Sequence, residues 1–520
     1  MLPLLAFALL AGPSRAHAAV RPEDKVMPWV IEKTAGGATA EFLVMLTAQA
    51  DLSPAKLPAT KTAKGWFVRN ALWETAQATQ GPLLAELQAR GVEHRAFYIV
   101  NMVWVKGDRS LVLDLAARPD VAAIEGNPVV HNDLPQEQRA GEGSCPPTGV
   151  ETGVAYVRAP EVWAMGFTGQ GVVVGGQDTG YDWDHPALQP HYRGWNGVVA
   201  DHDYNWHDSI HSGGGVCGAN SPVPCDDTNH GTHTMGTAVG DDLAPGHQIG
   251  VAPGAKWIGC RNMNQGNGTP ATYIECFEFF LAPYPVGGTP DEGDPSKAPD
   301  VTINSWVCPP SEGCGPNSLL AAVKAQRAAG IVTQVSAGNS GPGCSSVDTP
   351  PAHYDQVFST GALNTGTDTL ASFSSRGPVT TVVTNTTLGR IKPDIAAPGT
   401  DTCSCVPGGG YSSGFSGTSM AGPHVSGAIA LLLSAVPALS GDVNAIERRM
   451  AQGAFHLSTS SCSSIPGFFP NNLFGYGRLD ALCAVLGAMP GVSAESLAGA
   501  GCAPLASNEV PVTVRQATGR

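Results

Sequence analysis

From Val150 onward the sequence alternates short apolar runs with glycine-rich loops and helical patterns, one of which covers Ser318–Ala329. The apolar runs that we predict to be strands are Gly171–Gly176, Trp257–Cys260, Val301–Ser305 and Ile331–Ser336. Strands that alternate with helices are typical of a parallel sheet covered by helices. We therefore predict an α/β fold for this part of the chain.

Residues 41–130 form a second, smaller pattern. The predicted elements are a strand at Glu41–Leu46, a helix at Thr62–Arg90, strands at Val92–Val100 and Asn101–Val105, a helix at Ser110–Arg118 and a strand at Val121–Val130. This β-α-β-β-α-β order is typical of a ferredoxin-like α+β unit. The stretch from Pro135 to Pro147 is polar and rich in Gly and Pro, which predicts an exposed linker.

Composition excludes two classes of protein. Of the 520 residues, 42% are hydrophobic and 14% are charged, with a net charge of −15, which argues against a disordered polyelectrolyte and against a nucleic-acid binder. Residues 1–140 hold 14 Lys or Arg and 14 Asp or Glu, so the whole net charge lies in the rest of the chain. All 13 cysteines lie there as well, and if they pair they indicate an oxidising compartment.

The first residues predict export. Leu2–Ala11 is apolar, and Ala16-His17-Ala18 has the small-x-small pattern of a signal-peptidase site, although no Lys or Arg precedes the apolar run. A membrane anchor needs about 20 apolar residues, more than this run contains. We therefore predict a signal peptide at residues 1–18, a secreted protein (extracellular, periplasmic or on the outer surface) and no membrane attachment.

Three short segments carry residues suited to chemistry. They are centred on Asp178 (Gly-Gln-Asp-Thr-Gly), His230 (Asn-His-Gly-Thr-His) and Ser419 (Gly-Thr-Ser-Met-Ala-Gly-Pro-His-Val). A serine hydroxyl becomes a good nucleophile when a base removes its proton and a carboxylate orients that base. Ser419 would begin a buried helix, whose free N–H groups stabilise an oxyanion. The three segments together predict nucleophilic acyl transfer.

Two of these segments have simpler interpretations when each is taken alone. Asp-Thr-Gly after a strand is often only a turn, and His-Gly-Thr-His is as typical of a metal-ligand pair as of a structural helix start. The nine-residue serine segment is much more specific. Its presence with the other two favours a catalytic triad over a coincidence.

In the order Asp, His, Ser, these segments resemble the subtilisin-like serine proteases, or subtilases. The resemblance covers Val154–Leu482, and within the family the stretches 163–188 and 201–207 are most similar to the bacillopeptidase F branch. It implies a subtilisin-like parallel sheet flanked by helices. It also implies that the 41–130 unit is the core of an inhibitory propeptide, which assists folding.

The resemblance divides the chain and assigns roles. Residues 19–140 would be the propeptide and linker, 141–490 the peptidase domain and 491–520 a tail of unknown role, with maturation within Pro135–Cys145. Asp178 would orient the base, His230 would be the general base and Ser419 the nucleophile. Asn339, in Ser-Ala-Gly-Asn-Ser-Gly, would be an oxyanion-hole donor beside the Ser419 N–H. We expect His233 to be a packed helix residue.

Substrate recognition in subtilases implies two backbone segments that clamp an extended peptide. Here these are Gly266 to Gly268 and the run Ser305, Trp306, Val307. The first specificity pocket would lie between Ser305–Val307 and the loop that contains Gly338, with Thr349 near its floor. Most relatives carry glycine where Val307 stands, so we hypothesise a preference for small or medium apolar residues. The partners are then extended polypeptides and the chain's own propeptide, with no nucleic acid.

Metal sites are a weaker prediction. His202, His207 and His211 are interleaved with aspartates, as in some zinc loops, but their irregular spacing favours a solvated loop. Calcium is commoner in subtilases, yet Ala187 stands where a family calcium carboxylate would fall. We assign no metal ligand, expect no cofactor in the chemistry, and leave structural calcium open.

We expect the cysteines to form disulfides that cross-link loops. Local pairs are predicted for Cys217 with Cys225 and for Cys308 with Cys314, whereas Cys403 and Cys405 stand too close together to pair. Two functional rivals to the protease remain. One is a binding protein that keeps the fold without turnover, and the other is a metallohydrolase that uses the histidines of 201–211.

Overall fold

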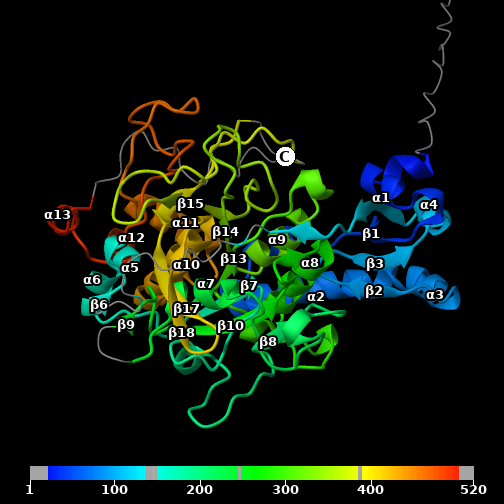
Figure 1. The fold of residues 1–520 in the computed structure, drawn as a ribbon, viewed down its shortest axis with the longest axis horizontal. Helices are drawn as coiled ribbons and strands as arrows, with labels where there is room; N and C mark the ends of the chain where they lie inside the picture. Colours follow the sequence, from blue (N-terminus) through cyan, green and yellow to red (C-terminus); the bar gives the residue numbers. More distant parts are fainter. Residues whose placement is uncertain are drawn as a thin grey trace, which may run out of the picture.

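The computed structural model describes residues 21–132, 134, 145, 149–243, 247–383 and 389–502. The predicted signal peptide and most of the predicted maturation region lie outside the described residues. Figure 1 shows two units: a small N-terminal one, drawn in blue, and a larger one that fills the rest of the picture. We refer to residues 21–132 as the N-terminal unit and to residues 149–502 as the peptidase unit.

The N-terminal unit has a four-stranded antiparallel sheet in the order β2-β3-β1-β4. Its main elements are β1 (Ala40–Leu46), β2 (His94–Phe97), β3 (Met102–Gly107), β4 (Val121–Gly126), α1 (Pro28–Lys33), α2 (Lys61–Thr79), α3 (Gly81–Ala89) and α4 (Arg109–Ala117). Phe42, Val44 and Ile124 pack with Leu115 of α4 in its own core. The predicted ferredoxin-like α+β unit is confirmed.

Several predicted boundaries in this unit are wrong, and the strand predicted at Val92–Val100 is only His94–Phe97. The helix predicted at Thr62–Arg90 is two helices, because Pro82 has no N–H with which to continue the hydrogen bonds of α2. The strand predicted at Val121–Val130 stops at Gly126, just before Asn127 and Pro128. Beyond that turn, β5 (Val130–His131) leaves the sheet and pairs with a strand of the peptidase unit.

The peptidase unit is built on seven parallel strands in the order β16-β15-β14-β13-β7-β10-β8. The strands are β7 (Val173–Asp178), β8 (Trp206–Asp208), β10 (Lys256–Arg261), β13 (Val301–Asn304), β14 (Val332–Ser336), β15 (Phe358–Leu363) and β16 (Ile395–Pro398). The helices that accompany the sheet include α7 (His230–Val239), α8 (Pro270–Leu281), α9 (Leu320–Ala328) and α10 (Thr418–Ala435). The predicted α/β class is confirmed.

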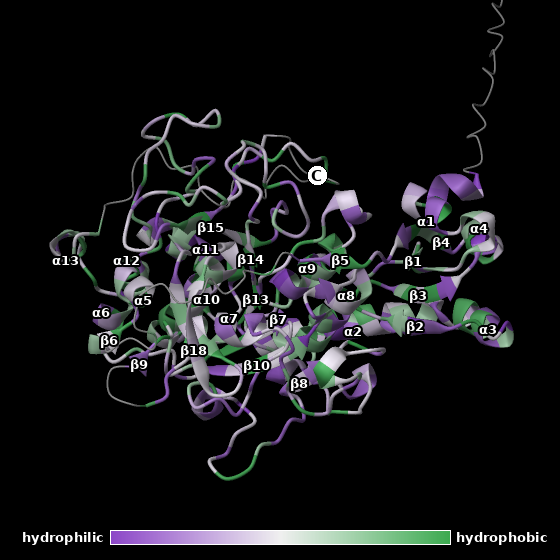
Figure 2. Cartoon of the chain, viewed as in Figure 1, coloured by the Kyte–Doolittle hydropathy of each residue, from purple (hydrophilic) through white to green (hydrophobic). Residues whose placement is uncertain are grey.

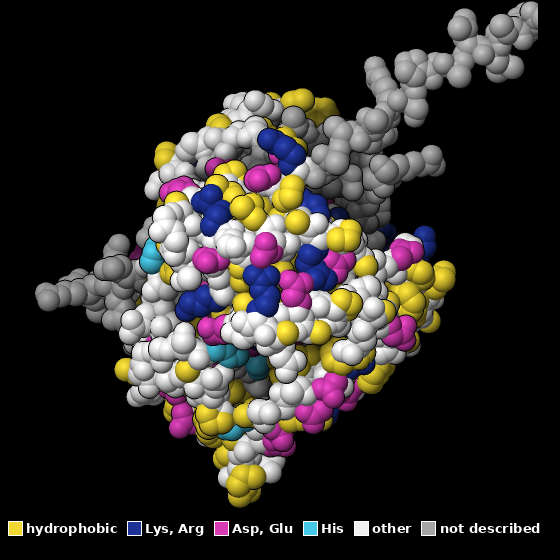
Figure 3. All heavy atoms as spheres, turned by 90° about the vertical axis from the view of Figure 1, so that its right-hand side faces the viewer, with side chains coloured by type: hydrophobic (Ala, Val, Ile, Leu, Met, Phe, Trp, Pro, Cys, Tyr) yellow, Lys and Arg dark blue, Asp and Glu magenta, His cyan; other side chains and the backbone are white. Residues whose placement is uncertain are grey.

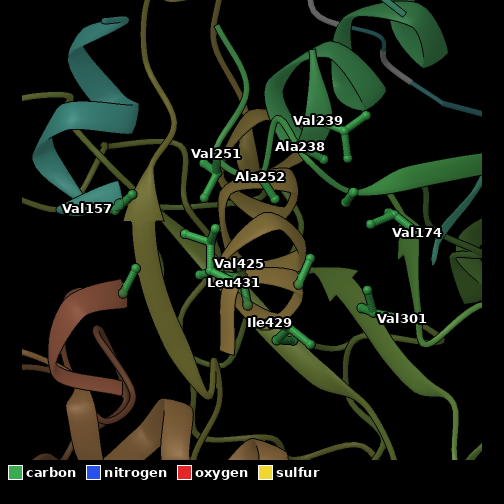
Figure 4. Close-up of a cluster of buried hydrophobic side chains, with 14 of the residues drawn as sticks. Val157, Val174, Ala238, Val239, Val251, Ala252, Val301, Val425, Ile429 and Leu431 are labelled. Atoms are coloured by element: carbon green, nitrogen blue, oxygen red, sulfur yellow. The ribbon is translucent and has the colours of Figure 1, made fainter. Parts of the chain in front are cut away.

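The core of this unit centres on α10. Figure 4 shows Val425 and Ile429 of this helix among side chains from the sheet, such as Val174 and Val301, and from α7, such as Val239. All five are fully buried. In Figure 2 hydrophobic residues gather around the central strands of the molecule. Burial of this kind holds α10, and therefore Ser419 in its first turn, rigidly against the sheet.

Smaller elements complete the peptidase unit. They are β6 (Gly149–Val150), β9 (His247–Gln248), β11 (Met263–Asn264), β12 (Asn267–Gly268), β17 (Thr402–Val406), β18 (Gly410–Phe415), α5 (Thr152–Tyr156), α6 (Ala159–Ala164), α11 (Val443–Gly453), α12 (Ala481–Ala488) and α13 (Ala494–Gly499). Among the described residues, no helix has the length and apolar character needed to cross a membrane.

The structure has six disulfides: five lie within the peptidase unit and one joins that unit to Cys145. They are Cys145–Cys403, Cys217–Cys225, Cys260–Cys276, Cys308–Cys314, Cys344–Cys462 and Cys483–Cys502. The two predicted local pairs are confirmed, and Cys403 pairs with Cys145 rather than with its neighbour. The odd cysteine is Cys405, whose thiol is free and buried. Burial raises the pKa of this thiol well above its usual value, so it is an inert core residue.

Candidate active site

The three predicted triad residues lie at one edge of the parallel sheet, where Asp178 and His230 are in contact. Asp178 is the last residue of β7, His230 is the first residue of α7, and Ser419 lies in the first turn of α10. The carboxyl ends of parallel strands share one edge, where α/β proteins place their ligands. All three side chains are largely buried, with Ser419 7% exposed.

The aspartate and the histidine form a tight pair. Nδ1 of His230 lies 2.6 Å from Oδ1 of Asp178, which also accepts the N–H of Thr179 at 2.7 Å. An ionised carboxylate only accepts hydrogen bonds, so the proton of the imidazole sits on Nδ1 and Nε2 presents its lone pair. Nε2 of His230 is buried and has no hydrogen-bond partner, as a waiting general base requires.

Opposing effects act on the pKa of His230. Burial alone would lower it, but the charge and the hydrogen bond of Asp178 together outweigh burial, so the pKa lies above its ordinary value. His233, one turn along the helix, differs: burial lowers its pKa to about 3, and its ring stacks on Phe415. His233 is a packed neutral residue, as predicted.

The loops that hold Asp178 and His230 share one buried carboxylate that sequence reasoning missed. Asp226 accepts the hydroxyl of Thr179 at 2.7 Å, and the N–H and hydroxyl of Thr232 at 2.9 and 2.6 Å. It thereby connects the residue after Asp178 with the first turn of α7. The two threonines in Asp-Thr-Gly and His-Gly-Thr are the only sequence signal that pointed to such a connection.

Ser419 is placed by its helix rather than by His230. Its hydroxyl donates to the carbonyl of Ser305 over 3.4 Å, a long bond that leaves it unengaged with the imidazole. Catalytic hydrogen bonds often form only once a substrate is bound. Pro423 has no N–H for the carbonyl of Ser419, four residues earlier, and the hydroxyl of Ser305 donates to that carbonyl instead, at 3.3 Å.

Asn339 is fixed beside the serine. Its side-chain oxygen accepts both the N–H and the hydroxyl of Thr418, each at 2.9 Å, which leaves its NH₂ group as the donor. Gly338, with φ of +99°, donates its N–H to the same hydroxyl at 3.2 Å. Thr418 therefore orients the predicted oxyanion donor at the amino end of α10, a role that the sequence motif did not reveal.

Comparison with known proteins agrees with this geometry. The model of the subtilase family matches residues 169–477, more than half of the chain. The chain belongs to the subtilase family. Subtilases are serine peptidases, which confirms the predicted enzyme class.

Individual relatives differ in how much of their length the chain covers. Bacillopeptidase F of Bacillus subtilis (strain 168) is 36% identical over 448 residues, which are 83% of this chain but 29% of that protein. Subtilisin E of the same strain is 29% identical over 349 residues, 67% of this chain and 74% of that protein. The serine protease AprX, also of that strain, is 33% identical over 320 residues, 56% of this chain and 64% of that protein.

Beside Ser419, the subtilase has a cavity of about 290 Å³. Ser305, Val307, Gly338 and Thr349, all predicted to form the first specificity pocket, line it together with Ser419. Trp306 also lines it, but its ring stacks on Tyr273 at 3.9 Å and is almost fully buried. Trp306 thus shapes the wall from within the core.

The end of the N-terminal unit lies along this cavity. Val130 and His131 pair antiparallel with Asn267 and Gly268, so that β5 extends the β11-β12 hairpin. The next residue, Asn132, donates its N–H to Gly266 at 3.0 Å and accepts the N–H of Val307 at 2.9 Å through its side chain. The two predicted substrate-binding segments therefore hold a strand of the chain itself.

Further contacts connect the N-terminal unit to α8. Glu278 accepts the N–H groups of Tyr98 and Ile99 at 2.7 and 2.9 Å, and burial raises its pKa to about 8. Arg95 pairs with Glu275 at 3.2 Å. These carboxylates lie in the middle of an apolar helix and were not singled out from the sequence.

The histidines that invited a metal prediction separate in the structure. His207 and His211 both contact Glu275, at 2.8 and 2.9 Å, whereas His202 lies against Tyr192. Within the described ranges, no group of three or more His, Cys, Asp or Glu is arranged to hold a metal ion. Ala187 is fully buried and offers no side-chain oxygen, so the family calcium site that would use this position does not fit here.

Proposed function

We propose that this subtilase is a secreted serine endopeptidase made as a self-processing zymogen, with Asp178, His230 and Ser419 as its triad. The observation that carries the proposal is the 2.6 Å contact between His230 and Asp178, made where α10 presents Ser419. Membership of the subtilase family and the six disulfides, which are typical of exported proteins, support it.

In the proposed mechanism, His230 removes the proton of the Ser419 hydroxyl as this oxygen attacks the scissile carbonyl. Negative charge then develops on the carbonyl oxygen, where the NH₂ group of Asn339 and the backbone N–H of Ser419 donate to it. His230 next protonates the leaving amine, and an acyl-enzyme remains on Ser419. Water, activated by the same histidine, reverses these steps and releases the second product.

The N-terminal unit would be the inhibitor. A strand that joins β12 beside Ser419 occupies the place where an extended substrate adds by β-strand pairing. We propose residues 19–140 as the removable segment and 141–490 as the peptidase domain, with the cut within 135–145. The disulfide between Cys145 and Cys403 would then keep the new amino end attached to β17.

Val307 is proposed to restrict the first specificity pocket. Its side chain lines the cavity beside Gly338, where a glycine would leave more room. We expect a modest preference for small or medium apolar residues. A panel of quenched peptides that differ only at the residue before the scissile bond tests this, and much faster cleavage after Phe than after Ala or Leu would contradict it.

The proposed function is tested by labelling with a fluorophosphonate, which reacts only with an activated serine. The mature protein should be labelled, and Ser419→Ala should abolish labelling and leave a single uncut band on a gel. A mature, cleaved wild-type protein that resists the probe would favour a binding protein without turnover. Activity lost to a chelator, restored by zinc and unchanged in Ser419→Ala would favour a metallohydrolase.

A further inference from the structure

Glu312 stands on a small loop at the rim of the cavity that contains Ser419. The loop follows the substrate-binding segment that ends at Val307, and the disulfide Cys308–Cys314 closes it. A 3-10 turn at Pro310–Glu312 and a hydrogen bond from the N–H of Cys308 to Pro350 fix its course. A short loop with a disulfide and a prolyl turn is rigid, so its side chains have well-defined positions relative to the cleft.

The carboxylate of Glu312 contacts the strand in the cleft. Its Oε2 accepts the backbone N–H of His131 at 3.1 Å. Successive N–H groups of a strand point to opposite edges. The N–H of Asn132 points toward β12 and donates to Gly266, so that of His131 faces away from β12. Glu312 therefore accepts the N–H of His131, which does not donate to β12 in the pairing of β5 with β12.

Glu312 also determines the charge of the cavity that contains Ser419. Of the described residues that line the cavity, it is the only Asp or Glu, and none is Lys or Arg. No Lys or Arg among the described residues of the cavity wall balances it, and Glu312 is half-buried at the rim, so water screens its charge only in part. A substrate with Lys or Arg next to the carboxylate would supply the missing cation, whereas an acidic residue would be repelled.

We infer that Glu312 is a further substrate-binding residue of this peptidase, which accepts the N–H of the substrate residue opposite Asn267 and favours a basic side chain there. The inference rests on the proposed endopeptidase function. The loop closed by Cys308–Cys314 would then contribute to specificity. The two backbone segments, Gly266–Gly268 and Ser305–Val307, do not select for charge, because backbone pairing does not depend on the charge of the side chain.

Quenched peptides with a common scissile bond test this. Lys, Gln or Glu is placed in turn at each of the five residues before that bond, and kcat/KM is measured for the mature wild type, Glu312→Gln and the control Glu495→Gln, an exposed carboxylate on α13. At one position we expect Lys to exceed Glu by about tenfold in the wild type and the control. In Glu312→Gln this ratio should fall to about one.

A second measurement changes the substrate's N–H group instead of its side chain. N-methylation of the peptide bond at the selected position removes the N–H and should lower kcat/KM of the wild type about tenfold, with no such effect at the same position in Glu312→Ala. Equal Lys-to-Glu ratios in the wild type and Glu312→Gln, or equal effects of N-methylation in the wild type and Glu312→Ala, would overturn the inference. A wild type that cleaves no peptide and resists the fluorophosphonate would instead overturn the proposed function.

Discussion

The two units of the molecule are stabilised and charged in different ways. The peptidase unit carries the whole net charge of −15 and five disulfides within its own bounds, with a sixth to Cys145, whereas the N-terminal unit has no cysteine and a balanced charge. Figure 3 shows acidic and basic side chains interspersed on the face that includes the N-terminal unit. The N-terminal unit has an apolar core of its own and also shares a second buried apolar cluster with the peptidase unit.

The contacts between the units reflect this difference. Basic residues of the N-terminal unit reach acidic or carbonyl groups of the peptidase unit: Lys61 pairs with Asp300 at 2.8 Å, and Arg69 donates to the carbonyl of Asp291, also at 2.8 Å. Both contacts are largely buried: the side chains of Lys61 and Asp300 are 15% and 14% exposed. Together with the apolar cluster that both units share, these contacts form a close interface, as expected if the N-terminal unit is the proposed inhibitor.

The largest expected effect is that of a variant in which the two units can no longer be cleaved apart. Ser419→Ala removes the proposed nucleophile, so kcat on peptides should fall by about 2 × 10⁶, as for the equivalent loss in subtilisin, a member of this family. The two units should then stay covalently joined, which a gel of the full chain over time would show. Cleavage at the normal site in purified Ser419→Ala would mean that another enzyme separates them.

Loss of the oxyanion donor should slow the separation without preventing it. Asn339→Ala removes the NH₂ group that Thr418 orients, and kcat should fall by about 10²–10³ with little change in KM, the size seen for such a donor in subtilisin. Steady-state kinetics on one peptide checks this. A large rise in KM with kcat unchanged would place Asn339 in substrate binding instead.

Between the units, Glu278 is expected to be the strongest single contact. Glu278→Ala leaves the N–H groups of Tyr98 and Ile99 without their acceptor, which costs about 1–3 kcal/mol and should speed amide exchange at both residues by about tenfold or more. Exchange is measured in the full chain with Ser419→Ala, so that the units remain joined. Glu74→Ala, at an exposed carboxylate of α2, is the control and should leave exchange unchanged.

The smallest effect concerns pH. As the proposed general base, His230 can act only when neutral, so activity should be lost as the pH falls through its pKa. Asp178 places that pKa above the ordinary value of about 6.5, so the acidic limb of kcat/KM should lie above pH 6.5. In the proposed mechanism, self-processing and peptide hydrolysis use the same histidine, so their pH profiles should share this acidic limb. If the acidic limbs of the two pH profiles differed by a full pH unit, a different group would control the cleavage between the units.

Much of this molecule follows from local sequence. Alternating strand and helix patterns predicted the parallel sheet, and the segments around Asp178, His230 and Ser419 predicted the triad, because glycine-flanked turns at strand ends and helix starts are local features. The disulfides Cys217–Cys225 and Cys308–Cys314 were predictable for the same reason, since short spacing forces the two residues together.

Contacts between distant segments were decided only by the tertiary structure. The pairing of Cys145 with Cys403, 258 residues apart, depends on how the sheet brings two segments together. The same holds for Asp226 beneath the triad loops and for Thr418 behind Asn339. The contact of Glu312 with His131 exists only because β5 leaves its own sheet for β12. Sequence determined the local backbone and its chemistry, while the packing of buried surfaces chose which of these groups meet.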